Sequence, residues 1–228
     1  MFDIILLDLD DTILDFAATE RKSMIRMLNA IGIIPTEELL SRYHVINKSL
    51  WLMLERGELT REQVGTRRFE LLFSELGIQA EPVQCEQLYR RFLSEGNDVL
   101  PGAAEAVAKL HEKYRLFAAT NSTVAVQEGR LRHTGLRQYF EDLFISESME
   151  AYKPSADFFV RAFEKIPHFD PSRALMVGDS LSSDIRGGNN AGIATCWINP
   201  RHLPRREGIR VDYEIESIRD LPALLEAL

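Results

Sequence analysis

The sequence has few cysteines, no excess of basic residues and no long apolar run. Cys85 and Cys196 are the only cysteines, and they lie far apart and outside any Cys-x-x-Cys pair. This excludes a disulfide framework and a paired-cysteine zinc site, and we expect two buried thiols in a reducing compartment. The formal net charge of −8 gives no attraction for phosphate backbones, so we expect no nucleic acid polymer as a partner.

No apolar run approaches the ~18 residues that a membrane span requires, so no membrane association is expected. The N-terminal sequence Met-Phe-Asp soon reaches Asp8, Asp10 and Asp11, which is not the pattern of a signal peptide. We therefore expect a cytoplasmic protein. Internal repeats and low-complexity segments are also lacking, whereas hydrophobic residues make up 45% of the 228, enough for a packed core.

Short apolar runs alternate with helical patterns along most of the chain. The runs predict strands at 2–7, 116–119, 143–145, 174–177, 194–198 and 213–215. Helical patterns cover 102–113, 123–133, 156–165 and 181–191. Alternation with short connections predicts an α/β fold, a Rossmann-like open parallel sheet with helices on both faces.

Residues 16–97 differ because they show helical periodicity and no strand. Thr36 and Thr60 are the residue type that caps helix N-termini, and a further helix is expected over 85–93. We predict that 16–97 form a helical domain inserted after the first strand. Residues 1–15 and 98–228 then form the Rossmann-like core.

Polar side chains follow several of the predicted strands. They are Asp8 and Asp10, Thr120 and Asn121, Lys153, and Asp179 with Asp184. In open α/β sheets, ligands bind beyond the carboxyl ends of the strands, so these groups should share one edge. A lone Asp there would be a turn or a helix cap, but four carboxylates that converge repel one another unless protons or a cation neutralise them. All-oxygen ligands without His or Cys select Mg²⁺, and we expect that Mn²⁺ can substitute.

Four short motifs in this order resemble those of the haloacid dehalogenase superfamily of phosphohydrolases. They are Asp8-Leu9-Asp10-Asp11-Thr12, the strand-terminal Thr120, Lys153-Pro154, and Gly178-Asp179-Ser180-Leu181-Ser182-Ser183-Asp184. Each motif alone is weak, but all four at predicted strand ends are specific. The resemblance covers essentially the whole chain.

The resemblance implies a magnesium-dependent phosphomonoesterase. Asp8 would attack phosphorus to form an aspartyl-phosphate, and Asp10 would protonate the leaving group and then activate water. Thr120 and Asn121 would contact the phosphoryl oxygens, and Lys153 would neutralise the phosphoryl group and the nucleophile.

The same resemblance implies how the metal is bound. Magnesium would contact Asp8, the main-chain carbonyl of Asp10 and Asp179, with Asp184 a direct ligand or acting through a bound water. Dehalogenases of the superfamily lack an acid/base carboxylate at the position of Asp10, which argues for phosphate chemistry. Many relatives have Gly where this chain has Glu150, whose side chain we expect to face solvent.

The predicted helical insertion resembles the cap type that closes over the site and selects the leaving group. Within it, the segment from Tyr43 to Trp51 resembles the bacterial branch that hydrolyses pyrimidine nucleoside 5′-monophosphates. Asn47 and Trp51 share one helix face, so an amide could pair with the base and an aromatic could stack on it, with Phe16 lining the same pocket. The simpler alternatives are a core aromatic for Trp51, a surface residue for Asn47 and a core contact for Phe16.

Other functions remain open from the sequence. A phosphoglycolate or sugar-phosphate phosphatase shares all four motifs, and a phosphoglucomutase-like transferase shares the same intermediate. A 2-haloacid dehalogenase and a non-catalytic binding module are more distant alternatives. In the leading interpretation the partner is a small-molecule phosphate ester and the protein is a monomer or homodimer.

Overall fold

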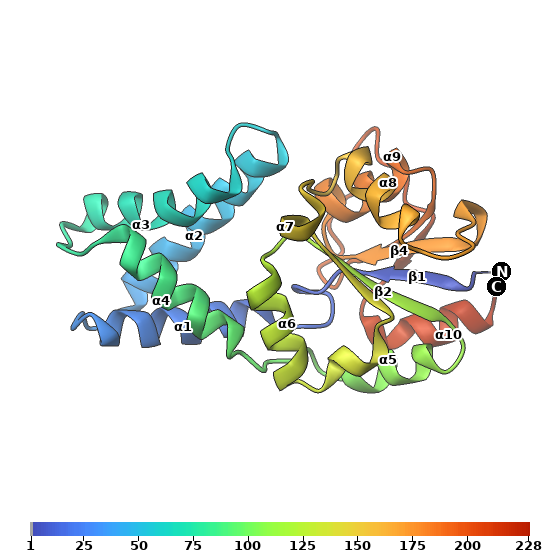
Figure 1. The fold of residues 1–228 in the computed structure, drawn as a ribbon, viewed down its shortest axis with the longest axis horizontal. Helices are drawn as coiled ribbons and strands as arrows, with labels where there is room; N and C mark the ends of the chain where they lie inside the picture. Colours follow the sequence, from blue (N-terminus) through green and yellow to red (C-terminus); the bar gives the residue numbers. More distant parts are fainter. Residues whose placement is uncertain (1) are drawn as a thin grey trace. The chain divides into compact units, whose positions relative to one another are not determined.

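A computed structural model describes residues 2–228 and divides the chain into two compact units (Figure 1). The sheet unit comprises the residues up to Phe16 together with Asn97–Leu228, and the helical unit comprises Ala17–Gly96. None of the helices formed by residues 2–228 has the length and apolar character needed to cross a membrane.

The sheet unit contains six strands in the order β3-β2-β1-β4-β5-β6, and every neighbouring pair is parallel. The strands are β1 (Ile4–Leu7), β2 (Arg115–Thr120), β3 (Asp142–Ile145), β4 (Ala174–Gly178), β5 (Ala194–Ile198) and β6 (Tyr213–Ile215). This confirms the predicted parallel sheet. The observed bounds of β5 and β6 equal the predicted ones, and the other strands differ from theirs only at the ends.

Helices connect the strands of the sheet unit. They are α5 (Ala103–His111), α6 (Val124–His133), α7 (Ser146–Met149), α8 (Ala156–Glu164), α9 (Arg186–Asn190) and α10 (Leu221–Glu226). The helix predicted over 181–191 is present, and its first part is a π-helical turn, η3 (Leu181–Ile185), that leads directly into α9. In this turn the main-chain N–H of Ile185 donates to the carbonyl of Ser180, five residues earlier.

The two faces of the sheet are covered by different helices (Figure 1). Ile5 and Leu7 of β1 belong to a buried cluster with residues of α5, α6 and α10. Ile4 and Leu6 belong to a second buried cluster with residues of α8. Alternate residues of one strand thus enter opposite cores, which explains why the strands read as continuous apolar runs.

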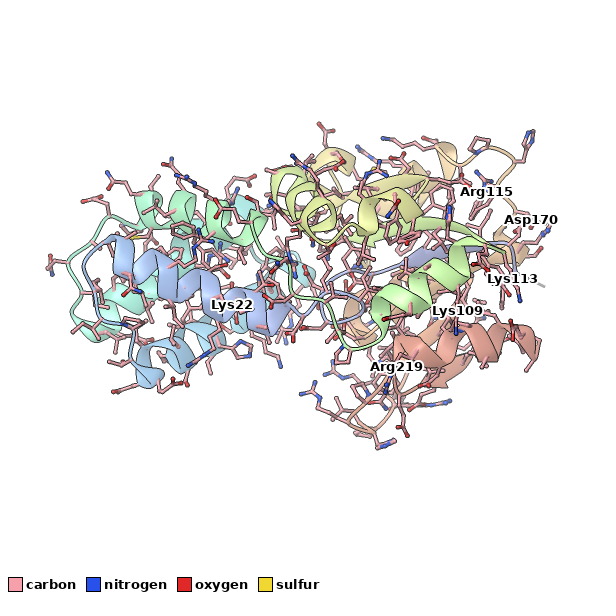
Figure 2. All side chains as sticks on the ribbon, turned by 90° about the horizontal axis from the view of Figure 1, so that it is seen from below. Lys22, Lys109, Lys113, Arg115, Asp170 and Arg219 are labelled. Atoms are coloured by element: carbon pink, nitrogen blue, oxygen red, sulfur yellow. The ribbon has the colours of Figure 1, made fainter. Side chains whose placement is uncertain are left out.

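After the helical unit the chain re-enters the sheet unit, and a glycine sets the backbone conformation just before α5. Gly102 precedes this helix with φ of 75°, and a Cβ atom there would lie 2.2 Å from Cδ of Arg219. Only glycine combines this backbone conformation with such a close approach. Lys113, which follows α5, pairs with Glu226 of α10 at 2.6 Å on the surface where Figure 2 labels Lys113 and Arg219.

The helical unit is built from α1 (Phe16–Ala30), α2 (Glu37–Glu55), α3 (Arg61–Leu76) and α4 (Pro82–Ser94), and its described residues form no strand. The side chains of Thr36 and Thr60 cap α2 and α3, as predicted. Three aromatic rings meet in its core: the ring of Tyr43 is stacked on that of Phe69 at 5.6 Å and meets that of Tyr89 edge-on at 5.5 Å.

Two smaller expectations from the sequence are confirmed. Cys85 and Cys196 are both buried and free. Glu150 faces solvent with 81% of its side chain exposed, and Arg161 lies beside it at 3.4 Å. Neither cysteine nor Glu150 therefore takes part in the polar site at the sheet edge.

Candidate active site

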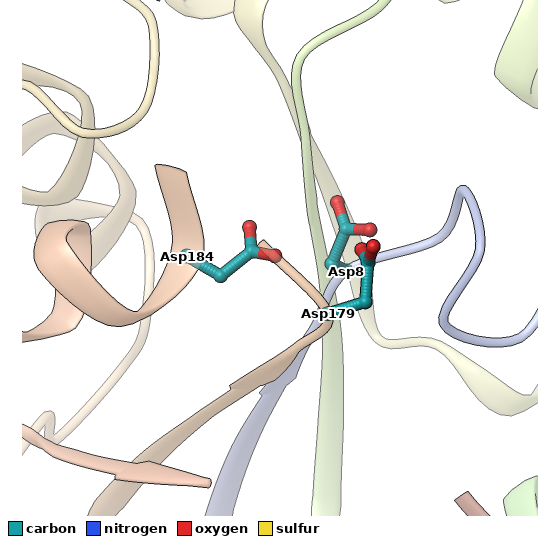
Figure 3. Close-up of side chains that lie close together, drawn as sticks. All are labelled: Asp8, Asp179 and Asp184. Atoms are coloured by element: carbon teal, nitrogen blue, oxygen red, sulfur yellow. The ribbon is translucent and has the colours of Figure 1, made fainter. Parts of the chain in front are cut away.

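Three carboxylates meet at the carboxyl ends of β1 and β4 (Figure 3). Asp8, Asp179 and Asp184 each offer an oxygen, and these oxygens lie within 4.8 Å of one another. The strands bring them together because Leu7 of β1 pairs with Val177 of β4, so the residues that follow leave the sheet side by side.

The turn after β4 fixes the third carboxylate. A Cβ atom on Gly178 would lie 2.2 Å from Oδ2 of Asp184, so the close packing of this side chain requires glycine. The same oxygen accepts a hydrogen bond of 3.0 Å from the main-chain N–H of Ser180. Trp197 donates from its indole N–H to the main-chain carbonyl of Asp179 at 2.8 Å.

Lys153 is the cation within this cluster. Its Nζ lies 2.7 Å from Oδ1 of Asp8 and 2.6 Å from Oδ1 of Asp184, and it also donates to the carbonyl of Ala119. Only 1% of the side chain is exposed. The amide of Asn121 holds the Lys153 backbone from both sides, accepting from its N–H at 2.9 Å and donating to its carbonyl at 2.8 Å.

The side chain of Asn121 is thus directed at the Lys153 backbone. Its observed role is to position the loop that carries the lysine. Direct contact between Asn121 and a substrate stays a prediction.

Burial and like charge govern the protonation of this site. Burial raises the pKa of Asp8 to about 8, against the lowering effect of Lys153 and with further raising by Asp184 and Asp10. Burial, followed by the charges of Asp184 and Asp8, raises the pKa of Asp179 well above its usual range. Burial disfavours the charged form of Lys153, but Asp184 and Asp8 outweigh it and raise its pKa overall.

These residues fit a hard divalent cation. One lysine faces three carboxylates, and no residue within 2–228 donates a hydrogen bond to the Asp179 carboxylate. A cation at the cluster would relieve the repulsion between carboxylates that adds to the effect of burial on the pKa values, and oxygen donors of this kind suit magnesium. Asp8, Asp179 and Asp184 are the side chains that could hold it.

The side chain of Asp10 lies outside the three-carboxylate cluster, in contrast to the convergence of four carboxylates expected from the sequence. It contacts α6 instead. Gln127 donates to its Oδ2 at 2.8 Å, and Arg130 forms an ion pair with its Oδ1. Gln127 also donates to Oγ1 of Thr120 at 3.2 Å. A main-chain contribution of Asp10 to a metal stays a prediction.

The sequence reasoning missed Gln127 and Arg130. The helix that carries them was predicted, and their spacing of three places both on one helix face. Nothing in the local pattern showed that this face is buried against Asp10, since charged residues on a helix usually mark a solvated side.

The predicted nucleotide-binding residues lie in different surroundings. Asn47 is buried in the helical unit, where its amide donates to Glu20 at 2.7 Å and accepts from Arg68 at 3.1 Å. The simpler alternative of a surface residue is therefore wrong, and the amide takes part in an internal network, while contact between Asn47 and a base stays a prediction. Trp51 on α2 is partly exposed, and Phe16 lies at the start of α1 in the sheet unit, with its ring 5.7 Å from the guanidinium carbon of Arg130.

The family model for the haloacid dehalogenase-like hydrolases matches residues 2–192, which includes every residue of the sheet-edge site. The chain belongs to this family. It is therefore a hydrolase.

Several relatives of this haloacid dehalogenase-like hydrolase align over nearly its full length. YfnB of Bacillus subtilis, named as a HAD-hydrolase, is 39% identical over 97% of this chain and 94% of its own. The pyrimidine 5′-nucleotidase PynA of Streptococcus pneumoniae is 38% identical over 96% and 93% of the two chains. The pyrimidine 5′-nucleotidase YjjG of Escherichia coli is 35% identical over 98% of each chain.

The fold agrees with these alignments. The crystal structure of YfnB bound to magnesium superimposes with a TM-score of 0.94 over 98% of each chain, at 38% identity. The parallel sheet and the helical unit are thus both present in a relative of known structure.

Proposed function

We propose that this protein is a magnesium-dependent phosphomonoesterase that hydrolyses nucleoside 5′-monophosphates, pyrimidine nucleotides above all. The observation that carries the proposal is the setting of Asp8. Its carboxylate is ion-paired with Lys153 and lies beside Asp179 and Asp184, and a second carboxylate, Asp10, follows two residues later. This set provides a nucleophile, a positive charge, an oxygen-ligand site and an acid/base.

In the first half-reaction, a carboxylate oxygen of Asp8 attacks phosphorus and forms an aspartyl-phosphate. The bond from phosphorus to the ester oxygen breaks, and the departing nucleoside alkoxide takes a proton from Asp10. Lys153 stabilises the added negative charge, and the hydroxyl of Thr120 donates to a phosphoryl oxygen.

In the second half-reaction, Asp10 takes a proton from water as the water oxygen attacks phosphorus. The bond between phosphorus and Asp8 then breaks, which releases inorganic phosphate and restores both carboxylates to their starting state. Asp8 and Asp10 each act in both half-reactions, and no other acid or base is required.

Magnesium held by Asp8, Asp179 and Asp184 would neutralise charge on the phosphoryl group. Support for this cofactor comes from the donor set and from the magnesium-bound structure of YfnB. Mn²⁺ offers similar oxygen preferences and is proposed as a substitute.

The choice of nucleotides rests on two relatives named as pyrimidine 5′-nucleotidases, each more than 90% covered by the alignment. The partly exposed Trp51 is an aromatic surface suited to stacking on a base. We propose that Trp51 contributes to nucleotide selectivity.

The test is phosphate release, with and without magnesium, across a matched substrate panel. It holds pyrimidine and purine 5′-monophosphates, their deoxy forms, phosphoglycolate and several hexose phosphates. A higher kcat/KM for pyrimidine monophosphates, lost with a chelator, is expected. A preference for phosphoglycolate or hexose phosphates would reject the nucleotide assignment and leave the Asp8 chemistry in place.

A further inference from the structure

Helix α6 carries two buried polar side chains that the reaction described above does not use. Gln127 is fully buried and Arg130 is 1% exposed, and they lie one turn apart on the same face. Both are directed at residues of the sheet-edge site. Burying polar side chains of this size costs free energy unless specific interactions compensate for it.

The two side chains hold both carboxylate oxygens of Asp10. Gln127 donates from Nε2 to Oδ2 at 2.8 Å, and Arg130 donates from Nη1 to Oδ1. The Asp10 side chain itself is 27% exposed, so one helix anchors a carboxylate that is otherwise open to the site. Held at both oxygens, the carboxylate has one defined orientation.

Gln127 also sets the direction of the Thr120 hydroxyl. The same Nε2 donates to Oγ1 of Thr120 at 3.2 Å, so this oxygen is an acceptor toward α6. The hydrogen of the Thr120 hydroxyl is then free to be donated elsewhere. Gln127 thus connects the proposed acid/base with the proposed phosphoryl contact.

Arg130 has few compensating contacts for a buried cation besides its ion pair with Asp10. Among residues 2–228 its Nε and Nη2 find no hydrogen-bond partner although both are buried. Its guanidinium carbon lies 5.7 Å from the centre of the Phe16 ring, a cation–π contact that compensates only in part. A buried group that leaves donors unsatisfied is costly, and an apolar side chain would fill the same space at lower cost.

We infer that Gln127 and Arg130 are positioning residues that fix the carboxylate of Asp10 and the hydroxyl of Thr120. This inference rests on the proposed function, because there Asp10 protonates the leaving group. Positioning matters most where a proton must be delivered. A nucleoside alkoxide needs that proton, whereas p-nitrophenolate leaves without it, and the later attack of water is common to both substrates. Loss of the pair should therefore lower kcat/KM, which reports the formation of the aspartyl-phosphate, unequally for the two substrates.

The experiment compares uridine 5′-monophosphate with p-nitrophenyl phosphate in the full chain with magnesium. Arg130→Met should lower kcat/KM for the nucleotide by about 10- to 100-fold, through kcat more than through KM. The loss with p-nitrophenyl phosphate should be smaller, and Arg130→Lys should recover part of the nucleotide activity. Arg132→Ala, an exposed neighbour on the same helix, should match the unaltered protein on both substrates.

A second variant keeps the inference testable if Arg130→Met does not fold. Gln127→Leu removes the other donor to Asp10 and should show the same unequal loss. Equal losses on the two substrates, or none, would overturn the positioning role while phosphatase activity stands.

Failure of the proposed function has a different signature, namely no phosphate release from either substrate by the unaltered protein. In that case crystal structures of the unaltered protein and of Arg130→Met decide the inference. Spread of the Asp10 carboxylate over several positions in the variant supports it. A single unchanged position overturns it.

Discussion

The ammonium nitrogen of Lys153 lies 2.7 Å from the carboxylate of Asp8, although 145 positions separate the two residues in the chain. The pair joins the end of β1 to the loop between α7 and α8, and both side chains are at least nine-tenths buried. Because Lys153 also contacts Asp184, it is the shared counter-charge of a site with more acid than base. The first prediction therefore concerns its removal.

Replacing Lys153 with Met should both destabilise and inactivate the protein. Breaking a buried ion pair from one side costs about 3–5 kcal/mol, because it leaves carboxylates without their counter-charge. Urea unfolding of the metal-free protein measures this loss, and phosphate release should fall by at least about 10²-fold. Lys109→Met on the exposed side of α5 is the control. Equal stability of the two variants would contradict the assigned role.

Magnesium should raise the melting temperature more at pH 8 than at pH 5. The folded-state pKa of Asp8, about 8, lies above its ordinary value of 3.8. Its contribution to the stability of the metal-free protein is therefore complete below pH 3.8 and is lost as the pH rises through about 8. Magnesium must displace the proton from Asp8, so the affinity for magnesium rises as the pH rises and this proton is lost.

Differential scanning fluorimetry with EDTA or magnesium across this range measures the effect. Asp179→Asn is the control and should reduce the magnesium-induced shift at both pH values. A larger shift at pH 5 than at pH 8 would contradict the assigned metal site.

Glu86→Ala should strongly destabilise the helical unit. Glu86 is 9% exposed and accepts from Nε of Arg68 at 3.0 Å and from Arg90 as well. Its removal leaves the buried guanidinium of Arg68 without its counter-charge, a loss of about 3–5 kcal/mol. Glu75→Ala breaks the exposed pair with Arg42 and should change the urea midpoint little. Similar midpoints for the two variants would refute a buried network.

The sequence predicted the sheet and the meeting of Asp8, Asp179 and Asp184 at its edge because both follow from short-range patterns. A strand end followed by Asp8 or by Gly178-Asp179 is readable locally, and parallel strands bring such ends to one edge. The prediction that these residues share one edge therefore did not require the register of β1 and β4 to be known. The sequence thus indicated which chemical groups lie at the site, but not the distances between them.

What the sequence could not predict are polar groups paired between segments that are far apart in the chain. Arg130 with Asp10, and Asn47 with Arg68, join segments whose packing no local periodicity encodes. The π-helical turn at Leu181–Ile185 was missed for a related reason, because an extra residue in a helical turn leaves the apolar pattern nearly unchanged.

Trp51→Ala should raise KM for uridine 5′-monophosphate by about 10-fold or more, since base–aromatic stacking contributes about 1–3 kcal/mol. The KM for p-nitrophenyl phosphate should change little, because it carries no base. Leu52→Ala, a neighbouring exposed residue on α2, is the matched control. An equal rise in KM for both substrates would return Trp51 to a packing role.

The measurement that tests the central claim most directly is phosphate release from uridine 5′-monophosphate by the unaltered protein and by Asp8→Asn, both with magnesium. Asp8 is proposed as the nucleophile, so the variant should lose at least about 10³-fold in kcat. Circular dichroism should show an intact fold, because the substitution keeps the size of the side chain. Phosphate release by Asp8→Asn within about tenfold of the unaltered rate would contradict the covalent mechanism.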